Sequence, residues 1–222
     1  YTLSDTPVGL QVDVANQSLR QALQSANGLP RLTHTAAVYD VAFSPDSQWL
    51  ASASGDYMVR LWPREHLTEP PMLLQGHTGV VFDLAFHPDG KLLASASADQ
   101  TVRLWSLTEP GVELAVLQGH TAGIARITFS PDGKWLASAS TDQTVRLWSV
   151  AVPTTPAVVL HGHTARIYDA AFSPDSQLLA SASQDKTVRI WQVNEPDVAP
   201  LVLTAHEDGV AALAFSPDGA FF

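Results

Sequence analysis

Histidine, serine and aspartate recur together along this 222-residue chain, and these residue types can perform hydrolytic or metal chemistry. A Ser-His-Asp set supplies a nucleophile and its general base, and histidine is a common metal ligand. A catalytic constellation normally occurs once, in a cleft, with an exposed nucleophile. This set instead recurs with five histidines spaced 43 residues apart: His34, His77, His120, His163 and His206. We therefore predict no catalytic site, no metal site and no cofactor.

The tryptophans keep the same interval, at Trp62, Trp105, Trp148 and Trp191. A constant period of this length indicates one supersecondary unit, each copy burying its apolar face against the next. The second copy predicts four short strands, with a Pro-Asp-Gly turn at 88–90. These strands are expected at 71–74, 81–86, 92–97 and 101–105. Short strands at even spacing, repeated without interruption, favour a β-propeller over a sandwich.

The repeated motifs resemble those of the WD40 family. In the second copy they are Gly76 and His77, Phe-His-Pro-Asp-Gly at 86–90, Asp99, and Val-Arg-Leu-Trp at 102–105. The residue after tryptophan is never the family's aspartate, but this position varies within the family. The resemblance implies an all-β WD40 propeller of four-stranded antiparallel blades. We expect a linker with a short helix at 1–28, four repeats within 29–193 and an incomplete fifth at 194–222. The four repeats lie at about 29–62, 71–105, 114–148 and 157–191.

The segment before the repeats predicts a weak strand at 8–14 and a helix at 16–26 with one apolar stripe. Residues 4–7 and 18–24 resemble the junction in bacterial (cyanobacterial-type) signalling proteins, where a STAND-type or NACHT ATPase precedes WD40 repeats. The fifth copy stops before its last two strands, so we expect the chain to be part of a longer protein. Self-association through open blade edges, or a strand from 8–14, are the alternatives.

The resemblance also implies one buried hydrogen-bonded tetrad in each complete copy. A buried tryptophan N–H needs an acceptor, serine can accept it and donate onward, and a carboxylate fixes the histidine tautomer. The four expected tetrads are His34, Ser52, Asp56 and Trp62; His77, Ser95, Asp99 and Trp105; His120, Ser138, Asp142 and Trp148; and His163, Ser181, Asp185 and Trp191.

Positions that differ between copies are the candidates for specific binding, because loops on a rigid scaffold carry function. WD40-like propellers bind partners on the face that holds the loops into the innermost strands. The candidate partner-binding residues there are Tyr39, Phe82, Arg166, Tyr168, Thr141 and Gln184. Aromatic residues and arginine dominate interface hot spots. The alternative is that the rings only pack between blades. The third copy has Gly123 and Ala125, which would leave a shallow gap between aromatic neighbours.

One further position departs from the repeat. Six residues after the histidine the copies carry Asp40, Asp83, Arg126 and Asp169. In a ring of blades Arg126 would lie between Asp83 and Asp169, so we predict that it pairs with one or both near the channel. The alternative is three solvated carboxylates near the axis.

Composition limits the classes of partner. The net charge is −10 and the basic residues are dispersed, so nucleic acid is excluded as an expected partner. No apolar run is long enough to span a bilayer, and there is no cysteine, which fits a cytoplasmic protein. The leading hypothesis is a non-catalytic module that binds a protein or peptide. The alternatives are a sensor segment of a STAND-type ATPase, a propeller enzyme and a designed propeller.

Overall fold

The structure is a computed structural model that describes residues 34–67 and 69–219. The predicted linker at 1–28, with its strand at 8–14, its helix at 16–26 and the junction-like segments, lies outside the described residues. Within them, no helix is long and apolar enough to cross a membrane. Apart from one short 3-10 turn, η1 (Arg64–His66), the regular structure of the described part consists of strands.

The strands form four antiparallel four-stranded sheets, each in simple sequential order. The first sheet contains β1 (Val38–Phe43), β2 (Trp49–Ser54), β3 (Val59–Pro63) and β4 (Met72–Leu74). The second contains β5 (Val81–Phe86), β6 (Leu92–Ser97), β7 (Val102–Ser106) and β8 (Glu113–Leu117). The third contains β9 (Ile124–Phe129), β10 (Trp135–Ser140), β11 (Val145–Ser149) and β12 (Val158–Leu160). The fourth contains β13 (Ile167–Phe172), β14 (Leu178–Ser183), β15 (Val188–Gln192) and β16 (Leu201–Leu203).

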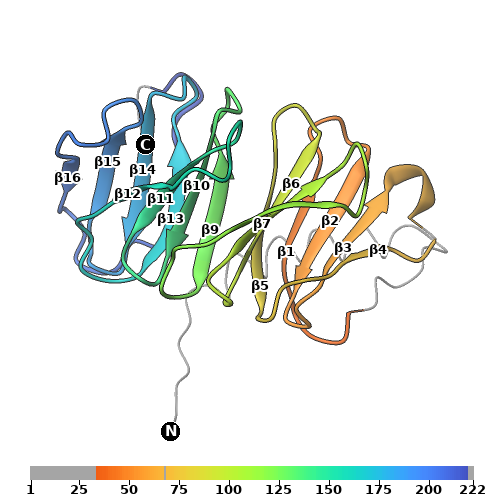
Figure 1. Cartoon of the computed structure of the whole chain (residues 1–222). Coiled ribbons are helices and arrows are strands. Elements are labelled where there is room, and N and C mark those ends of the chain that lie inside the picture. The colour runs from red at the N-terminus through yellow and green to blue at the C-terminus, as the bar shows by residue number, and fades with distance from the viewer. Residues whose placement is uncertain (1–33, 68, 220–222) are drawn as a thin grey trace, which may run out of the picture.

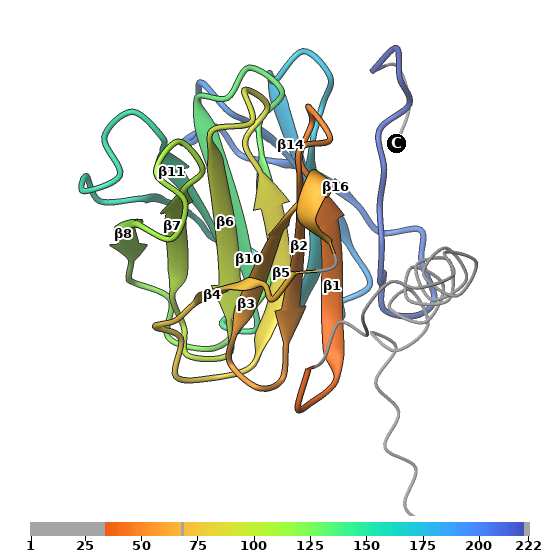
Figure 2. The ribbon, with the colours of Figure 1, turned by 90° about the vertical axis from the view of Figure 1, so that its right-hand side faces the viewer.

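The sheets stand in a row, with the first and fourth at its two ends (Figure 1). The innermost strands lie side by side in the order β1, β5, β9 and β13. Figure 2 shows the same row turned by 90°. This architecture confirms the expected all-β class and its four-stranded antiparallel sheets.

The sheets do not coincide with the sequence copies. The strand that opens the second copy, β4, pairs with β3 of the preceding copy, with Val59 opposite Leu74. The opening strand of the fifth copy, β16, likewise completes the fourth sheet, with Val188 opposite Leu203. The sequence copies and the sheets are therefore offset from each other by one strand.

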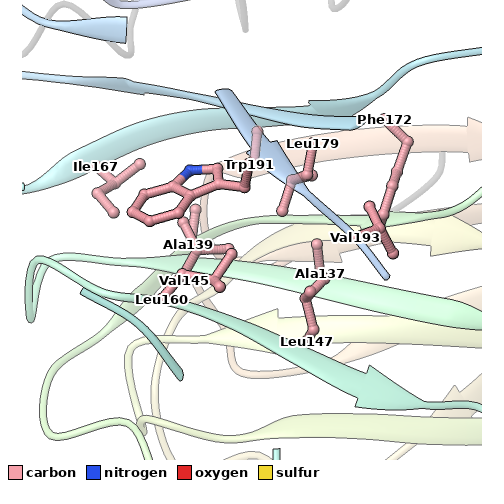
Figure 3. Packing of buried hydrophobic residues seen from close by; sticks show 11 residues of the cluster. Ala137, Ala139, Val145, Leu147, Leu160, Ile167, Phe172, Leu179, Trp191 and Val193 are labelled. Carbon is pink, nitrogen blue, oxygen red and sulfur yellow. The ribbon is translucent and has the colours of Figure 1, made fainter. Parts of the chain in front are cut away.

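The core lies between adjacent sheets. In the second strand of each sheet the small alanines are fully buried and let the next sheet approach closely, as Ala137 and Ala139 do. Trp191 of the fourth sheet packs against this face, next to Val145 and Ile167 (Figure 3). Trp105 and Trp148 occupy the same place between the earlier pairs of sheets. Each of these three tryptophans therefore joins its own sheet to the preceding one.

The outward face of the fourth sheet is covered by the segment that follows β16. Val210, Leu213 and Phe215 pack against the buried face formed by Ala180, Ala182, Val188 and Ile190. The backbone N–H of Leu213 donates to Asp169 Oδ2 at 2.9 Å. This segment of the fifth copy therefore occupies the position that an innermost strand holds against the other sheets.

Candidate interaction face

Three of the expected tetrads form continuous hydrogen-bonded relays. In the third sheet Trp148 Nε1 donates to Ser138 Oγ at 2.9 Å, and His120 Nε2 lies 2.8 Å from the same oxygen. His120 Nδ1 lies 2.8 Å from Asp142 Oδ2, which assigns the ring proton to Nδ1. The sets containing His77 and His163 repeat these contacts within 0.1 Å.

The first copy has a different arrangement. His34 Nε2 still lies 2.8 Å from Ser52 Oγ, but its Nδ1 is 3.7 Å from Asp56 Oδ2. Arg60 Nη1 donates to His34 Nδ1 at 2.7 Å and also pairs with Asp56 at 2.9 Å. Because Nδ1 accepts here, the ring proton must lie on Nε2, so the tautomer is reversed. Burial and the neighbouring Arg60 lower the pKa of His34 to about 4.

The arginine of the Val-Arg-Leu-Trp motif was missed by sequence reasoning. In the later copies its guanidinium lies over the glycine that precedes the histidine. A Cβ at Gly119 or Gly162 would lie 2.6 Å from the Nη1 of Arg146 or Arg189. The first copy has Thr33 at this position in the sequence, and there Arg60 binds histidine and aspartate instead. The signal available in the sequence was that the second, third and fourth copies each carry both this arginine and the glycine before the histidine.

The tetrads are unsuited to catalysis because their reactive atoms are already bonded. Ser95, Ser138 and Ser181 are fully buried, and each hydroxyl contacts both an imidazole and an indole. Burial lowers the pKa of His77, so this imidazole stays neutral. Burial alone would raise the pKa of Asp99, but hydrogen bonds from Thr101, Thr78 and His77 hold it at about 2. The relay therefore contains a neutral imidazole and an ionised carboxylate.

The variable aromatic residues occupy a specific backbone feature. In each innermost strand the register to the second strand shifts at one residue, which is left without a partner as a β-bulge. The four bulged residues are Tyr39, Phe82, Ala125 and Tyr168. Bulges re-aim a side chain away from the regular alternation of a strand. We call the surface formed by these residues and the adjacent turns at 55–58, 98–101, 141–144 and 184–187 the bulge face.

Two sets of contacts fix the aromatic side chains on the bulge face. Tyr39 and Phe82 meet edge to face across the first two sheets, with ring centroids 5.3 Å apart. The Arg166 guanidinium lies 5.0 Å from the Tyr168 ring centroid, and its Nε donates to Gln184 Oε1 at 3.0 Å. All three rings and Arg166 remain partly exposed, and Gln184 is exposed. The structure therefore brings five of the six partner-binding candidates into two preformed clusters.

Thr141 lies apart from these clusters. It is exposed in the turn between β10 and β11, and its hydroxyl donates to the Gly123 carbonyl at 3.1 Å. The second serine of three Ala-Ser-Ala-Ser segments supports the same region: Ser54 Oγ donates to the Ala37 carbonyl at 3.1 Å, Ser140 Oγ to the Gly123 carbonyl at 2.9 Å, and Ser183 Oγ to the Arg166 carbonyl at 3.0 Å. These serines hold the backbone that leads into the bulges, a role that was not assigned from the sequence.

Arg126 contacts both of the carboxylates expected for it. Its Nη1 lies 2.9 Å from Asp83 Oδ1 and its Nε lies 3.2 Å from Asp169 Oδ1, so three successive sheets are joined at one guanidinium. The alternative of solvated carboxylates is wrong, because Asp83 and Asp169 are buried. Burial raises the pKa of Asp83 and of Asp169, and the adjacent Arg126 opposes that shift.

These aspartates also link the sheets through the backbone. Asp40 accepts the Leu84 N–H at 3.0 Å, and Asp83 accepts the Ile127 N–H at 2.6 Å. At the joint from the third to the fourth sheet, Arg126 stands where the other complete copies have aspartate, and a guanidinium cannot accept a backbone N–H. There the Ala170 N–H donates instead to Asp169 at 2.9 Å. The ion pair of Arg126 with Asp169 is therefore the side-chain link at this joint.

Comparison with known families matches the chain to the model described as WD domain, G-beta repeat, in five segments. These segments are residues 29–63, 68–106, 111–149, 154–192 and 199–222, well over half of the chain. No curated protein matches the chain.

Proposed function

Because this chain belongs to the WD40-repeat family, whose repeats generally mediate protein–protein interactions, we propose that it is a recognition module that binds a protein or peptide on the bulge face. In this proposal Tyr39, Phe82, Arg166 and Tyr168 contact the partner, and the exposed Thr141 and Gln184 contribute polar contacts at its edge. The tetrads act only as structural supports.

The observation that carries the proposal is the placement of the aromatic residues on β-bulges. In a regular strand every residue pairs with the neighbouring strand and successive side chains point to opposite faces. Each bulge instead leaves one residue unpaired and changes the direction of its side chain. Rings held in place by their neighbours lose little conformational entropy when a partner binds. Aromatic residues and arginine are also the residue types that contribute most to interface energy.

The test is selection of peptides from a displayed random 12-residue library on the immobilised chain. Selected peptides are then measured by fluorescence anisotropy against the wild type, a Tyr39→Ala/Tyr168→Ala variant and a Leu114→Ala control. Leu114 is an exposed apolar residue on the outer strand β8, far from the bulges in the fold. We expect the double variant to bind at least tenfold more weakly and the control to bind normally. Equal affinity for all three proteins would refute the proposal.

A further inference from the structure

We propose that the third sheet holds the anchor position of the bulge face: Ala125 receives an aromatic side chain of the partner, which carries a basic residue next to it. This inference rests on the proposed function and names the chemistry of the partner. The contacts around Ala125 and the charge balance beside it support the two parts of the proposal.

Ala125 interrupts a series of rings at equivalent bulges. Strand β9 lies between β5 and β13, so the bulge of Ala125 lies between those of Phe82 and Tyr168. It presents only a methyl group where both neighbours present an aromatic ring. A ring from the partner would therefore have an aromatic neighbour on either side, the arrangement in which aromatic pairs contribute about 0.5–1.5 kcal/mol each.

The two neighbouring rings are each held by contacts with other side chains of the protein. Phe82 contacts Tyr39 of the first sheet, and Tyr168 carries the Arg166 guanidinium, which Gln184 holds in turn. Gly123, two residues before Ala125, also has no side chain. A Cβ at Gly123 would lie 3.3 Å from Ala98 Cα, so the turn of the second sheet accounts for the glycine. The position is therefore flanked by side chains that have contacts within the protein, and its own side chain is only a methyl group.

The charge balance next to Ala125 favours a basic neighbour in the partner. Three carboxylates, those of Asp40, Asp83 and Asp169, lie around the single guanidinium of Arg126. Arg126 pairs directly with Asp83 and Asp169. Among the described residues Asp40 has no ion pair, and its carboxylate accepts only backbone N–H groups. Burial raises the pKa of all three carboxyl groups, and a cationic side chain from the partner would stabilise their ionised forms.

The experiment uses the same 12-residue display library and adds three variants. Ala125→Tyr restores the ring found in the neighbouring copies and fills the proposed position. Ala125→Ser keeps the position small, and Ala211→Tyr adds the same ring at the equivalent, exposed position of the fifth copy. Thermal melting of each variant establishes that it is folded. Each enriched peptide is also synthesised with its aromatic residue replaced by alanine and its basic residue replaced by glutamate.

We expect enriched peptides to share one aromatic residue next to lysine or arginine. Ala125→Tyr should weaken their binding at least tenfold, whereas Ala125→Ser and Ala211→Tyr should change it less than threefold. Either peptide substitution should weaken binding at least tenfold. Peptides that depend on Tyr39 and Tyr168 but bind Ala125→Tyr normally, or that share no such pair, would overturn this inference and leave the proposed function intact. Peptides insensitive to every substitution on the bulge face would overturn both.

Discussion

Replacing Arg126 with methionine should destabilise the fold in a way that depends on Asp83 and on pH. The substitution keeps most of the side-chain volume and removes the charge that pairs with two buried carboxylates. Removing one partner of a buried ion pair costs about 3–5 kcal/mol. Since the Arg126 side chain is 47% exposed, water can replace part of the interaction. We therefore expect a loss of about 1.5–3 kcal/mol in the free energy of unfolding at pH 8.

The pH dependence follows from the carboxylates. Burial already raises the pKa of Asp83, and loss of Arg126 should raise it further. A carboxyl whose pKa is raised by folding binds more protons in the folded state, so stability falls as pH rises above the unfolded value of about 4. The cost of Arg126→Met should therefore be smaller at pH 5 than at pH 8.

A double-mutant cycle with Asp83→Asn isolates this interaction. Asparagine can still accept the Ile127 N–H through its carbonyl oxygen but carries no charge. In this background Arg126→Met should cost at least about 1 kcal/mol less than in the wild type. Urea unfolding at both pH values measures the free energies. A cost below about 0.5 kcal/mol at both pH values, or one independent of Asp83, would refute the reasoning.

Four other predictions concern the repeats themselves. Ser138→Ala should lose about 2–4 kcal/mol, because a buried indole N–H and a buried imidazole nitrogen lose their partner, and urea unfolding would measure this. Ser52→Ala should cost less, because Ser52 Oγ contacts the His34 imidazole whereas Ser138 Oγ contacts both an imidazole and an indole; equal losses would contradict this ranking. Ser47→Gly should stabilise the chain by about 0.5–1 kcal/mol, because Ser47 has a positive φ of 57°, and a lower melting temperature would argue against it. The melting temperature should fall below about pH 4, as Asp99, whose pKa is held at about 2 in the fold, is protonated. A melting temperature constant from pH 4 to 2 would exclude this effect.

Much of the sheet structure could be predicted because its signals are local and repeated. The strands β5 and β6 have the bounds expected from turn residues and the 43-residue period. The partner of β4 could not be read in this way, because Met72–Leu74 can pair on either side and only packing selects β3. The bulge at Tyr39 was also invisible, since one unpaired residue leaves the apolar pattern of the strand almost unchanged.

The residues of the candidate site were found by a different signal, their departure from the repeat. Arg126 was singled out because the other copies have aspartate, and its position between two sheets follows from the order of the copies. The bonds from Asp40 and Asp83 to the backbone of the next sheet could not be inferred, because they depend on how closely the sheets approach. Arg103 and its equivalents could not be found by this signal, because the complete copies all carry arginine at this position.

The offset between copies and sheets has a consequence for how such a chain can grow by gene duplication. Each copy from the second onwards contributes its opening strand to the sheet before it, as β8 does for the second sheet and β12 for the third. An additional 43-residue unit inserted at any internal boundary would supply an outer strand to the preceding sheet and receive one from the following copy. Recombination could therefore change the number of sheets without leaving an unpaired edge at the insertion point. The same exchange of strands would spread mechanical load between neighbours, because no internal copy can be pulled out without breaking two sheets.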